Sequence, residues 1–272
     1  MQSSPRRVRK IGRKVQRQKK TNLLQSLFFI LLILAAGFVF LQSSIFAVDN
    51  IEVKGTKFLN PEEVRKLTGL SLGVNIFKAD LKAAGAKVSL NPLVKQVEVF
   101  RDLPSGVVVQ ITERQPVGLL PFRGGLLEVD GEGYYLAQAP VGHQGSLPII
   151  NGVKVEQARL GKRVDNPRLS GPLSYLAAMS PEFISKISEI NGADPVNIIM
   201  YSLDKVMIKL GDETRVKEKL SLVEGRLKQK YPVEVEYIDV SFKGYPVIKF
   251  KEEYNPNPEV NRRPAVDESE IH

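Results

Sequence analysis

The segment LNPLVKQVEVFRDLPSGVVVQITERQPVG, residues 90–118, holds the pattern that decides the fold. Val94–Arg101 alternates apolar and polar residues, as a half-buried strand does, and Val107–Glu113 repeats the pattern. Between them, Asp102–Gly106 supplies the aspartate, proline, serine and glycine that favour a tight turn. The segment therefore predicts a β-hairpin with one apolar side.

The residues before this hairpin add a strand and two helices. Phe46–Val53 (FAVDNIEV) alternates in the same way and predicts a strand. The alanine-rich stretch Ala79–Lys87, which Asp80 can cap, predicts a short helix. With a further helix that begins near Asn60, residues 46–113 predict the order β-α-α-β-β.

The helix near Asn60 has signals at both ends. Asn60 can cap its first turn, and Pro61 suits the first helical position. Gly69 favours the left-handed conformation that ends a helix. We expect Val64 and Leu67 to form the buried side of this helix.

An uncharged stretch lies near the N-terminus, between Lys20 and Asp49. A helix from Leu23 to Ser44 is about 33 Å long, enough to cross a hydrocarbon core of ~30 Å. Residues 1–22 carry no acidic residue but nine cations, namely Arg6, Arg7, Arg9, Lys10, Arg13, Lys14, Arg17, Lys19 and Lys20. Because Lys and Arg favour the cytoplasmic side, we expect the N-terminus inside and the remainder of the chain outside.

The basic tail accounts for the net charge of +9, so the rest of the chain is close to neutral. A nucleic-acid-binding domain carries its positive charge on the folded surface, so we expect no nucleic-acid partner. The tail is instead expected to contact anionic lipid. The alternative for this region is a cleaved signal peptide ending at Ala47, but Ile45 fits poorly where such a site needs a small residue.

The second half of the chain predicts a β-rich domain with flanking helices. Its predicted helices are Pro167–Met179 and Arg215–Lys230, the latter with one apolar stripe made of Val216, Leu220, Val223 and Leu227. Its predicted strands are Leu119–Phe122, Leu126–Val129, Tyr134–Leu136, Ser185–Ile190, Asn197–Ser202, Lys205–Leu210, Val233–Asp239 and Tyr245–Phe250.

Two stretches in and between these strands depart from simple alternation. The apolar phase changes after Tyr237, which indicates either a β-bulge or a strand covered on both faces. Asp130–Gly133 (DGEG) lacks the regular acidic spacing of a calcium-binding loop, so we interpret it as a hairpin turn.

The order of these elements resembles one family closely. The fragments that carry the resemblance are FAVDNIEVKGTKFLNPEEV (46–64), the hairpin segment 90–118 with its Glu113-Arg114-Gln115-Pro116-Val117, and YIDVSF (237–242). They are similar to fragments of the FtsQ/DivIB bacterial cell-division proteins. The resemblance implies an α+β fold in five parts: a basic cytoplasmic tail (1–22), one transmembrane helix (23–45), a POTRA domain (46–118), an FtsQ/DivIB-type β domain (119–250) and a disordered C-terminal tail (251–272).

The resemblance also implies a function. The chain is expected to be a membrane scaffold of the divisome at the septum, which links early and late division proteins and supports septal peptidoglycan synthesis. Its β domain is expected to capture FtsB/DivIC-like and FtsL-like membrane proteins through the last strand, at Tyr245, Val247, Ile248 and Phe250. The same strand could instead only complete the sheet, and the POTRA sheet offers a free edge of its own.

The sequence contains few of the histidine and cysteine residues that often catalyse reactions or bind metals. The chain has no cysteine, and of its two histidines His143 is expected in a loop and His272 is the last residue. No phosphate-binding glycine loop and no serine-nucleophile motif is present. We therefore expect no enzyme activity, no cofactor and no metal. The remaining alternative is a POTRA-containing protein of an export or outer-membrane assembly system, which requires many amphipathic strands after the POTRA domain.

Overall fold

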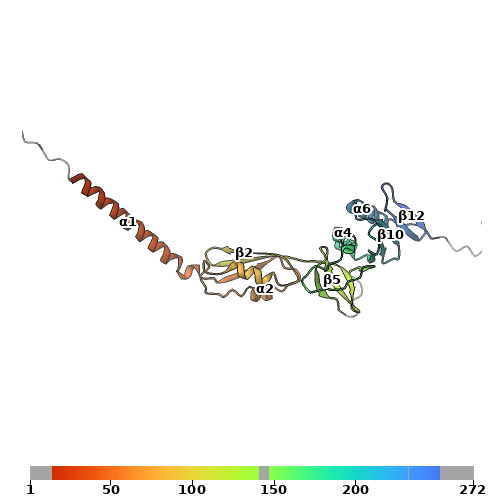
Figure 1. The fold of residues 1–272 in the computed structure, drawn as a ribbon, viewed down its shortest axis with the longest axis horizontal. Helices are drawn as coiled ribbons and strands as arrows, with labels where there is room; N and C mark the ends of the chain where they lie inside the picture. Colours follow the sequence, from red (N-terminus) through yellow and green to blue (C-terminus); the bar gives the residue numbers. More distant parts are fainter. Residues whose placement is uncertain (1–13, 141–146, 232, 252–272) are drawn as a thin grey trace, which may run out of the picture. The chain divides into compact units, whose positions relative to one another are not determined.

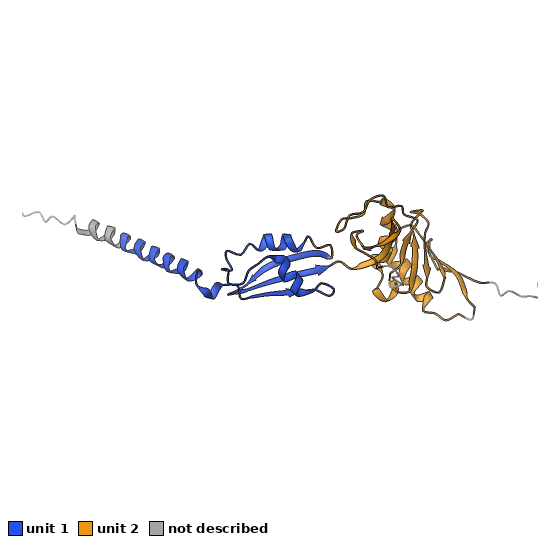
Figure 2. Cartoon of the chain, turned by 90° about the horizontal axis from the view of Figure 1, so that it is seen from below, with its two compact units in different colours: residues 1–90, 94–113 blue, residues 91–93, 114–272 orange. Residues whose placement is uncertain are grey.

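The computed structural model describes residues 14–140, 147–231 and 233–251, with side chains from Leu23 onward. It divides into two compact units (Figure 2). Unit 1 contains residues 1–90 and 94–113, and unit 2 contains residues 91–93 and 114–272. The division falls between Glu113 and Arg114, whereas the sequence placed it after residue 118. The reason is that β4 (Pro116–Phe122) already belongs to the sheet of unit 2.

Unit 1 begins with the long helix α1 (Lys14–Leu41), shown in red in Figure 1. Its segment Leu23–Leu41 is long and apolar enough to cross a membrane. The helix ends at Leu41, before the predicted limit of residue 45, and is followed by a single 3-10 turn, η1 (Ser44–Phe46).

The rest of unit 1 has the predicted β-α-α-β-β order. Its elements are β1 (Asn50–Lys54), α2 (Pro61–Thr68), α3 (Leu81–Val88), β2 (Val94–Asp102) and β3 (Gly106–Glu113). The sheet order is β1-β3-β2, with β1 parallel and β2 antiparallel to β3. Side chains from both helices and from β3 form its core, including Val64, Ala84, Val88, Val107, Val109 and Ile111.

The helix caps of unit 1 are those that the sequence predicts. The Asn60 side chain accepts a hydrogen bond from Glu62 N, and Gly69 ends α2 with φ 65°. Asp80 caps α3 by accepting from Ala83 N.

Two predictions for unit 1 were wrong in detail. Leu67 is 41% exposed, and Thr68 takes its place on the buried side of α2, one turn after Val64. The first strand begins at Asn50 instead of Phe46, because Phe46 lies in the 3-10 turn and packs its ring against Phe77.

Unit 2 is built on one nine-stranded sheet of order β12-β11-β10-β9-β8-β7-β4-β5-β6. The strands not yet given are β5 (Gly125–Asp130), β6 (Tyr135–Gln138), β7 (Ile149–Asn151), β8 (Ile187–Asn191), β9 (Ile198–Ser202), β10 (Met207–Gly211), β11 (Val235–Asp239) and β12 (Val247–Phe250). Its helical segments are η2 (Pro167–Leu169), α4 (Ser170–Ala178), α5 (Pro181–Ile184) and α6 (Val216–Leu227). The helices α4 and α6 pack into the hydrophobic core of this unit through Tyr175, Leu176 and Val223.

The structure explains the change of apolar phase near Tyr237 and the segment Asp130–Gly133. In the β11–β12 pair the register shifts between Val235 and Tyr237, so the change of apolar phase reflects a β-bulge. Asp130 and its neighbours form a turn, because Asp130 Oδ1 accepts hydrogen bonds from Glu132 N and Tyr134 N. The short helix α5 was not predicted. His143, His272 and the tail from residue 252 lie outside the described residues.

Candidate partner-binding site

The last strand, β12, forms one edge of the nine-stranded sheet (blue in Figure 1). It pairs antiparallel with β11, with Ile238 opposite Ile248 and Asp239 opposite Val247. Within the described parts of the chain, no strand pairs with its other side. An edge of this kind can accept an extended segment from another protein.

The direction of the backbone groups along β12 follows from one hydrogen bond. Lys251 N donates to Glu234 O over 2.9 Å, so the Lys251 amide faces β11. Backbone groups alternate in direction along a strand, so Lys249 faces β11 as well. Ile248 and Phe250 therefore direct their N–H and C=O groups to the open edge.

Three of the four predicted site residues lie on this strand. Ile248 is half-buried and packs against the core, whereas Val247 is exposed on the opposite face. Phe250 is 39% exposed and contacts the Tyr231 ring edge to face, with 5.4 Å between centroids.

The fourth predicted residue, Tyr245, lies before the strand. The chain from Ser241 to Pro246 forms the turn between β11 and β12, so β12 begins at Val247 and not at Tyr245. Tyr245 is 89% exposed, and Phe242 of the same turn is also exposed. The turn therefore presents two aromatic side chains beside the open edge.

Charged pairs between β11 and β12 were not predicted. Lys249 Nζ lies 2.9 Å from Glu236 Oε2, and Lys251 Nζ lies 2.6 Å from Glu234 Oε2. The hydrogen bond from Lys251 lowers the pKa of Glu234. The signal for these pairs is the matching pattern of Glu-x-Glu at 234–236 and Lys-x-Lys at 249–251.

A hollow of about 500 Å³ opens next to the end of β12. Its lining includes Leu227 and Tyr231 after α6, Val235 and Ile238 of β11, and Lys251. Such a hollow can receive a side chain of a segment that pairs with the strand, because anchor residues of interfaces fill pockets of this kind.

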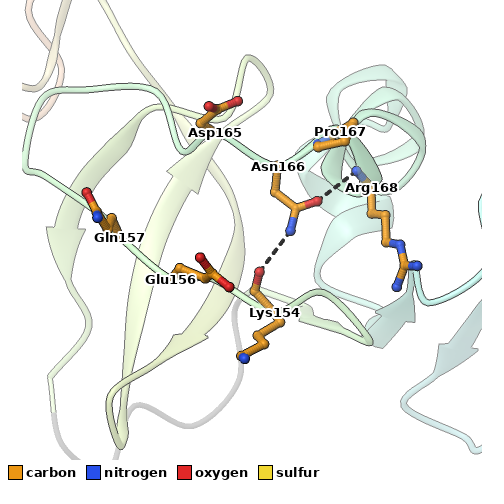
Figure 3. A pocket seen from close by; sticks show the side chains of 7 residues that line it. All are labelled: Lys154, Glu156, Gln157, Asp165, Asn166, Pro167 and Arg168. Carbon is orange, nitrogen blue, oxygen red and sulfur yellow. Dashed lines mark hydrogen bonds between the residues drawn. The ribbon is translucent and has the colours of Figure 1, made fainter.

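A second hollow of about 560 Å³ lies between residues 154–157 and the start of η2 (Figure 3). The Asn166 side chain bridges its two walls: its amide donates to Lys154 O over 2.8 Å, and its oxygen accepts from Arg168 N over 2.9 Å. The side chain thus caps η2 and braces the preceding loop, which is a structural role.

The most buried charged group of unit 2 is Lys219 on α6. Its ammonium donates to Tyr175 Oη over 3.2 Å and to Asp212 Oδ1 over 3.0 Å. Burial raises the pKa of Tyr175, and hydrogen bonds from Thr214 and Lys219 lower the pKa of Asp212. The Lys219 side chain ties α6 to the residues after β10. Among the described residues, no group of three or more His, Cys, Asp or Glu could hold a metal ion.

Comparison with known proteins gives consistent matches along the chain. A model of the POTRA domain of FtsQ type matches residues 46–114, and a model of the C-terminal domain of the cell division protein FtsQ/DivIB matches residues 121–241. The cell division protein FtsQ of Geotalea daltonii is 28% identical over 213 residues, which is 76% of this chain and 77% of that protein. The cell division protein DivIB of Clostridium tetani is 25% identical over 230 residues, 82% of this chain and 87% of that protein.

Among solved structures, the major extracytoplasmic domain of the cell division protein DivIB from Geobacillus stearothermophilus covers 40% of this chain and 87% of its own, at 18% identity and a TM-score of 0.30. The two family models match one after the other and together cover more than half of the residues. The first match falls almost entirely on unit 1 and the second on unit 2, and both follow an apolar helix that is long enough to span a membrane. The chain therefore belongs to the FtsQ/DivIB family of bacterial cell-division proteins.

Proposed function

We propose that this protein is a single-pass membrane scaffold of the divisome, which links early to late division proteins and supports septal peptidoglycan synthesis by binding and not by catalysis. The observation that carries the proposal is the open edge of β12. The family to which the chain belongs acts in cell division, and an open sheet edge is a surface on which a scaffold can bind a partner.

The partner proposed for this edge is an FtsB/DivIC-like membrane protein, together with its FtsL-like companion. An extended segment of the partner pairs with the outward N–H and C=O groups of Ile248 and Phe250. Backbone bonds alone give little selectivity, so side chains must supply it. Tyr245, Val247 and Phe250 are the exposed apolar groups available for this purpose.

The proposed location follows from the charge of the chain. The N-terminal tail stays in the cytoplasm and contacts anionic lipid, and the folded parts of the chain after residue 45 lie on the outer side of the membrane. The position at the septum rests on the family to which the chain belongs. No nucleic acid is involved, because the chain beyond the tail is close to neutral. A fluorescent fusion enriched at midcell agrees with this location, and an even peripheral signal counts against it.

The binding test uses the full-length protein and the extracytoplasmic segment of an FtsB/DivIC-like protein. Ile248→Pro removes an outward N–H together with the side chain, whereas Ile248→Ala removes only the side chain. We expect Ile248→Pro to bind much more weakly than Ile248→Ala. Equal binding of the two variants would show that this N–H pairs with no partner.

The control for Ile248→Pro is a proline substitution on the opposite edge of the same sheet. Ala139 N donates to Leu126 O, so the neighbouring Gln138 N–H on β6 points away from the sheet. Gln138→Pro therefore removes an outward donor of the same kind from the other edge. It should leave the affinity for the partner unchanged, and a thermal melt of each variant reports whether the sheet remains folded.

A further inference from the structure

The junction between α1 and the rest of unit 1 is fixed by hydrogen bonds. Asn75 Nδ2 donates to Leu41 O over 2.7 Å, and Ile76 N donates to Phe46 O over 2.7 Å. The last carbonyl groups of a helix have no partner within the helix, and Asn75 supplies one. The loop around Asn75 is therefore one hydrogen bond away from the end of the membrane-spanning segment.

A row of aromatic rings crosses the same junction. Phe40, inside the apolar segment, contacts Phe46 with 5.4 Å between ring centroids, and Phe46 contacts Phe77 with 5.3 Å. Phenylalanine rings are apolar, so contact with one another or with lipid removes a large area from water. The row thus continues from the span into the folded part of unit 1.

Further apolar side chains are exposed at this end of unit 1. Asp49 N donates to Ser105 O over 3.0 Å, so the β2–β3 turn with Leu103 lies beside the start of β1. We call residues 42–49, 70–78 and 102–105 the junction loops. Their exposed large apolar side chains are Ile45, Leu72, Val74, Phe77 and Leu103. Exposed apolar groups gathered in this way mark a surface that contacts another molecule or a membrane.

The junction loops are also held firmly in place. Arg101 Nε donates to Ile76 O over 2.8 Å, and its second amino group donates to Ala79 O over 3.2 Å. Lys78 Nζ lies 3.5 Å from Gln42 Oε1, directly after the span. At that depth an ammonium group can reach the lipid phosphates while its aliphatic stem stays among apolar groups.

We propose that the junction loops are a lipid-binding surface and lie within the headgroup region of the leaflet at the Leu41 end of the span. The lipid bilayer is the molecule that this surface contacts, because the surface is continuous with the membrane-spanning helix. Asn75, in one of the loops, also donates a hydrogen bond to Leu41 O at the end of that helix. In this arrangement the POTRA domain of unit 1 rests on the bilayer, and its position follows that of the helix.

The test exploits the absence of tryptophan from the chain. Phe77→Trp and Leu72→Trp each place one fluorescent reporter in the junction loops of the full-length protein. The variants are reconstituted in phosphatidylcholine vesicles with and without bromine near the headgroup end of the acyl chains, since bromine quenches tryptophan that it contacts. Both variants should lose fluorescence in the brominated vesicles and emit at shorter wavelength than tryptophan in water.

A matched control lies at the other end of the same sheet. Phe58 is 69% exposed, similar to the 63% of Leu72, but its amide binds Glu113 at the far end of β3. Phe58→Trp should keep its fluorescence, while Phe38→Trp, inside the span, should be quenched. Unquenched emission from both junction reporters, or equal quenching of the Phe58→Trp variant, would overturn the proposal. The vesicles hold no other protein, so a surface reserved for a protein partner gives the unquenched result.

Discussion

Glu113 holds the loop before α2 with a single carboxylate. Its oxygens accept hydrogen bonds from the amides of Lys57, Phe58 and Leu59, at 2.9–3.2 Å. Partial burial raises the pKa of this group, but the three amide hydrogen bonds outweigh the burial and lower it below the ordinary value of 4.5. The family-like motif at residues 113–117 thus has a structural role at its first residue.

Replacement of Glu113 should destabilise unit 1. Glu113→Ala removes the carboxylate that accepts charge-assisted hydrogen bonds from three amides, and we expect a loss of about 1–2 kcal/mol in the free energy of unfolding, allowing for partial exposure. Because the folded pKa is lowered, the contribution is complete above pH 4.5 and is lost as the pH falls through the folded value. Denaturant titrations of wild type and Glu113→Gln should therefore converge at acidic pH. A difference that is constant with pH would contradict the role of the charge.

Single residues also mark what the sequence could not show. The spacing of α6 identifies Leu220 and Val223 as buried, and both are. It gives no reason to bury Lys219, because its partners Tyr175 and Asp212 lie in other elements. The same holds for Arg114, which binds Asp130 and Glu132 and stacks on the Tyr134 ring. Such groups depend on contacts between distant parts of the chain, and periodicity carries no information on those.

At the scale of elements, local signals were sufficient wherever they were strong. The caps of α2 and α3 and the two strands of the hairpin 94–113 lie where the pattern places them. The predicted strand from Tyr245 failed at its start because Gly244, with φ 135°, and Pro246 keep the chain in a turn. At the candidate site the sequence therefore predicted the strand but not the ion pairs between Glu-x-Glu and Lys-x-Lys.

The two aromatic residues beside the edge should behave differently when truncated. Tyr245→Ala should weaken binding of the FtsB/DivIC-like segment by ~2 kcal/mol or more and leave the thermal melt unchanged, since Tyr245 is almost fully exposed. Phe250→Ala should weaken binding by a similar amount and also destabilise unit 2 by about 0.5–1.5 kcal/mol, because the contact with Tyr231 is lost. Binding titrations and melts of both variants separate the two effects. If both variants bound the segment with wild-type affinity, the partner site would lie elsewhere, for example on the POTRA domain.

At the scale of the whole molecule, the sequence predicted the division into span, POTRA unit and β-rich unit but not the strand order of the large sheet. The strand β7 joins the two halves of that sheet by parallel pairing with β4 and β8. Its partners are distant in sequence, and a strand of three residues carries no pattern of its own. The position of β12 at the edge of the sheet became visible only with the complete pairing.

Membrane topology can be tested on spheroplasts. The charge of the tail predicts one span with the N-terminus inside, so protease added to spheroplasts should remove residues 49–272 and spare the tail. Leu34→Arg should hinder insertion by about 2.5–3.5 kcal/mol, since it places a charge near the middle of the span. Full protection of the folded units from the protease would refute this orientation.

Amide hydrogen exchange along β12 of the full-length protein, with and without the FtsB/DivIC-like segment, tests whether this edge captures the partner. We predict that the amides of Ile248 and Phe250 exchange rapidly in the free protein and become protected in the complex, because they bond to the incoming segment. The Lys249 amide already faces β11 and should change much less. Protection that appears elsewhere, with unchanged exchange at Ile248 and Phe250, would contradict the claim that the β12 edge captures the partner.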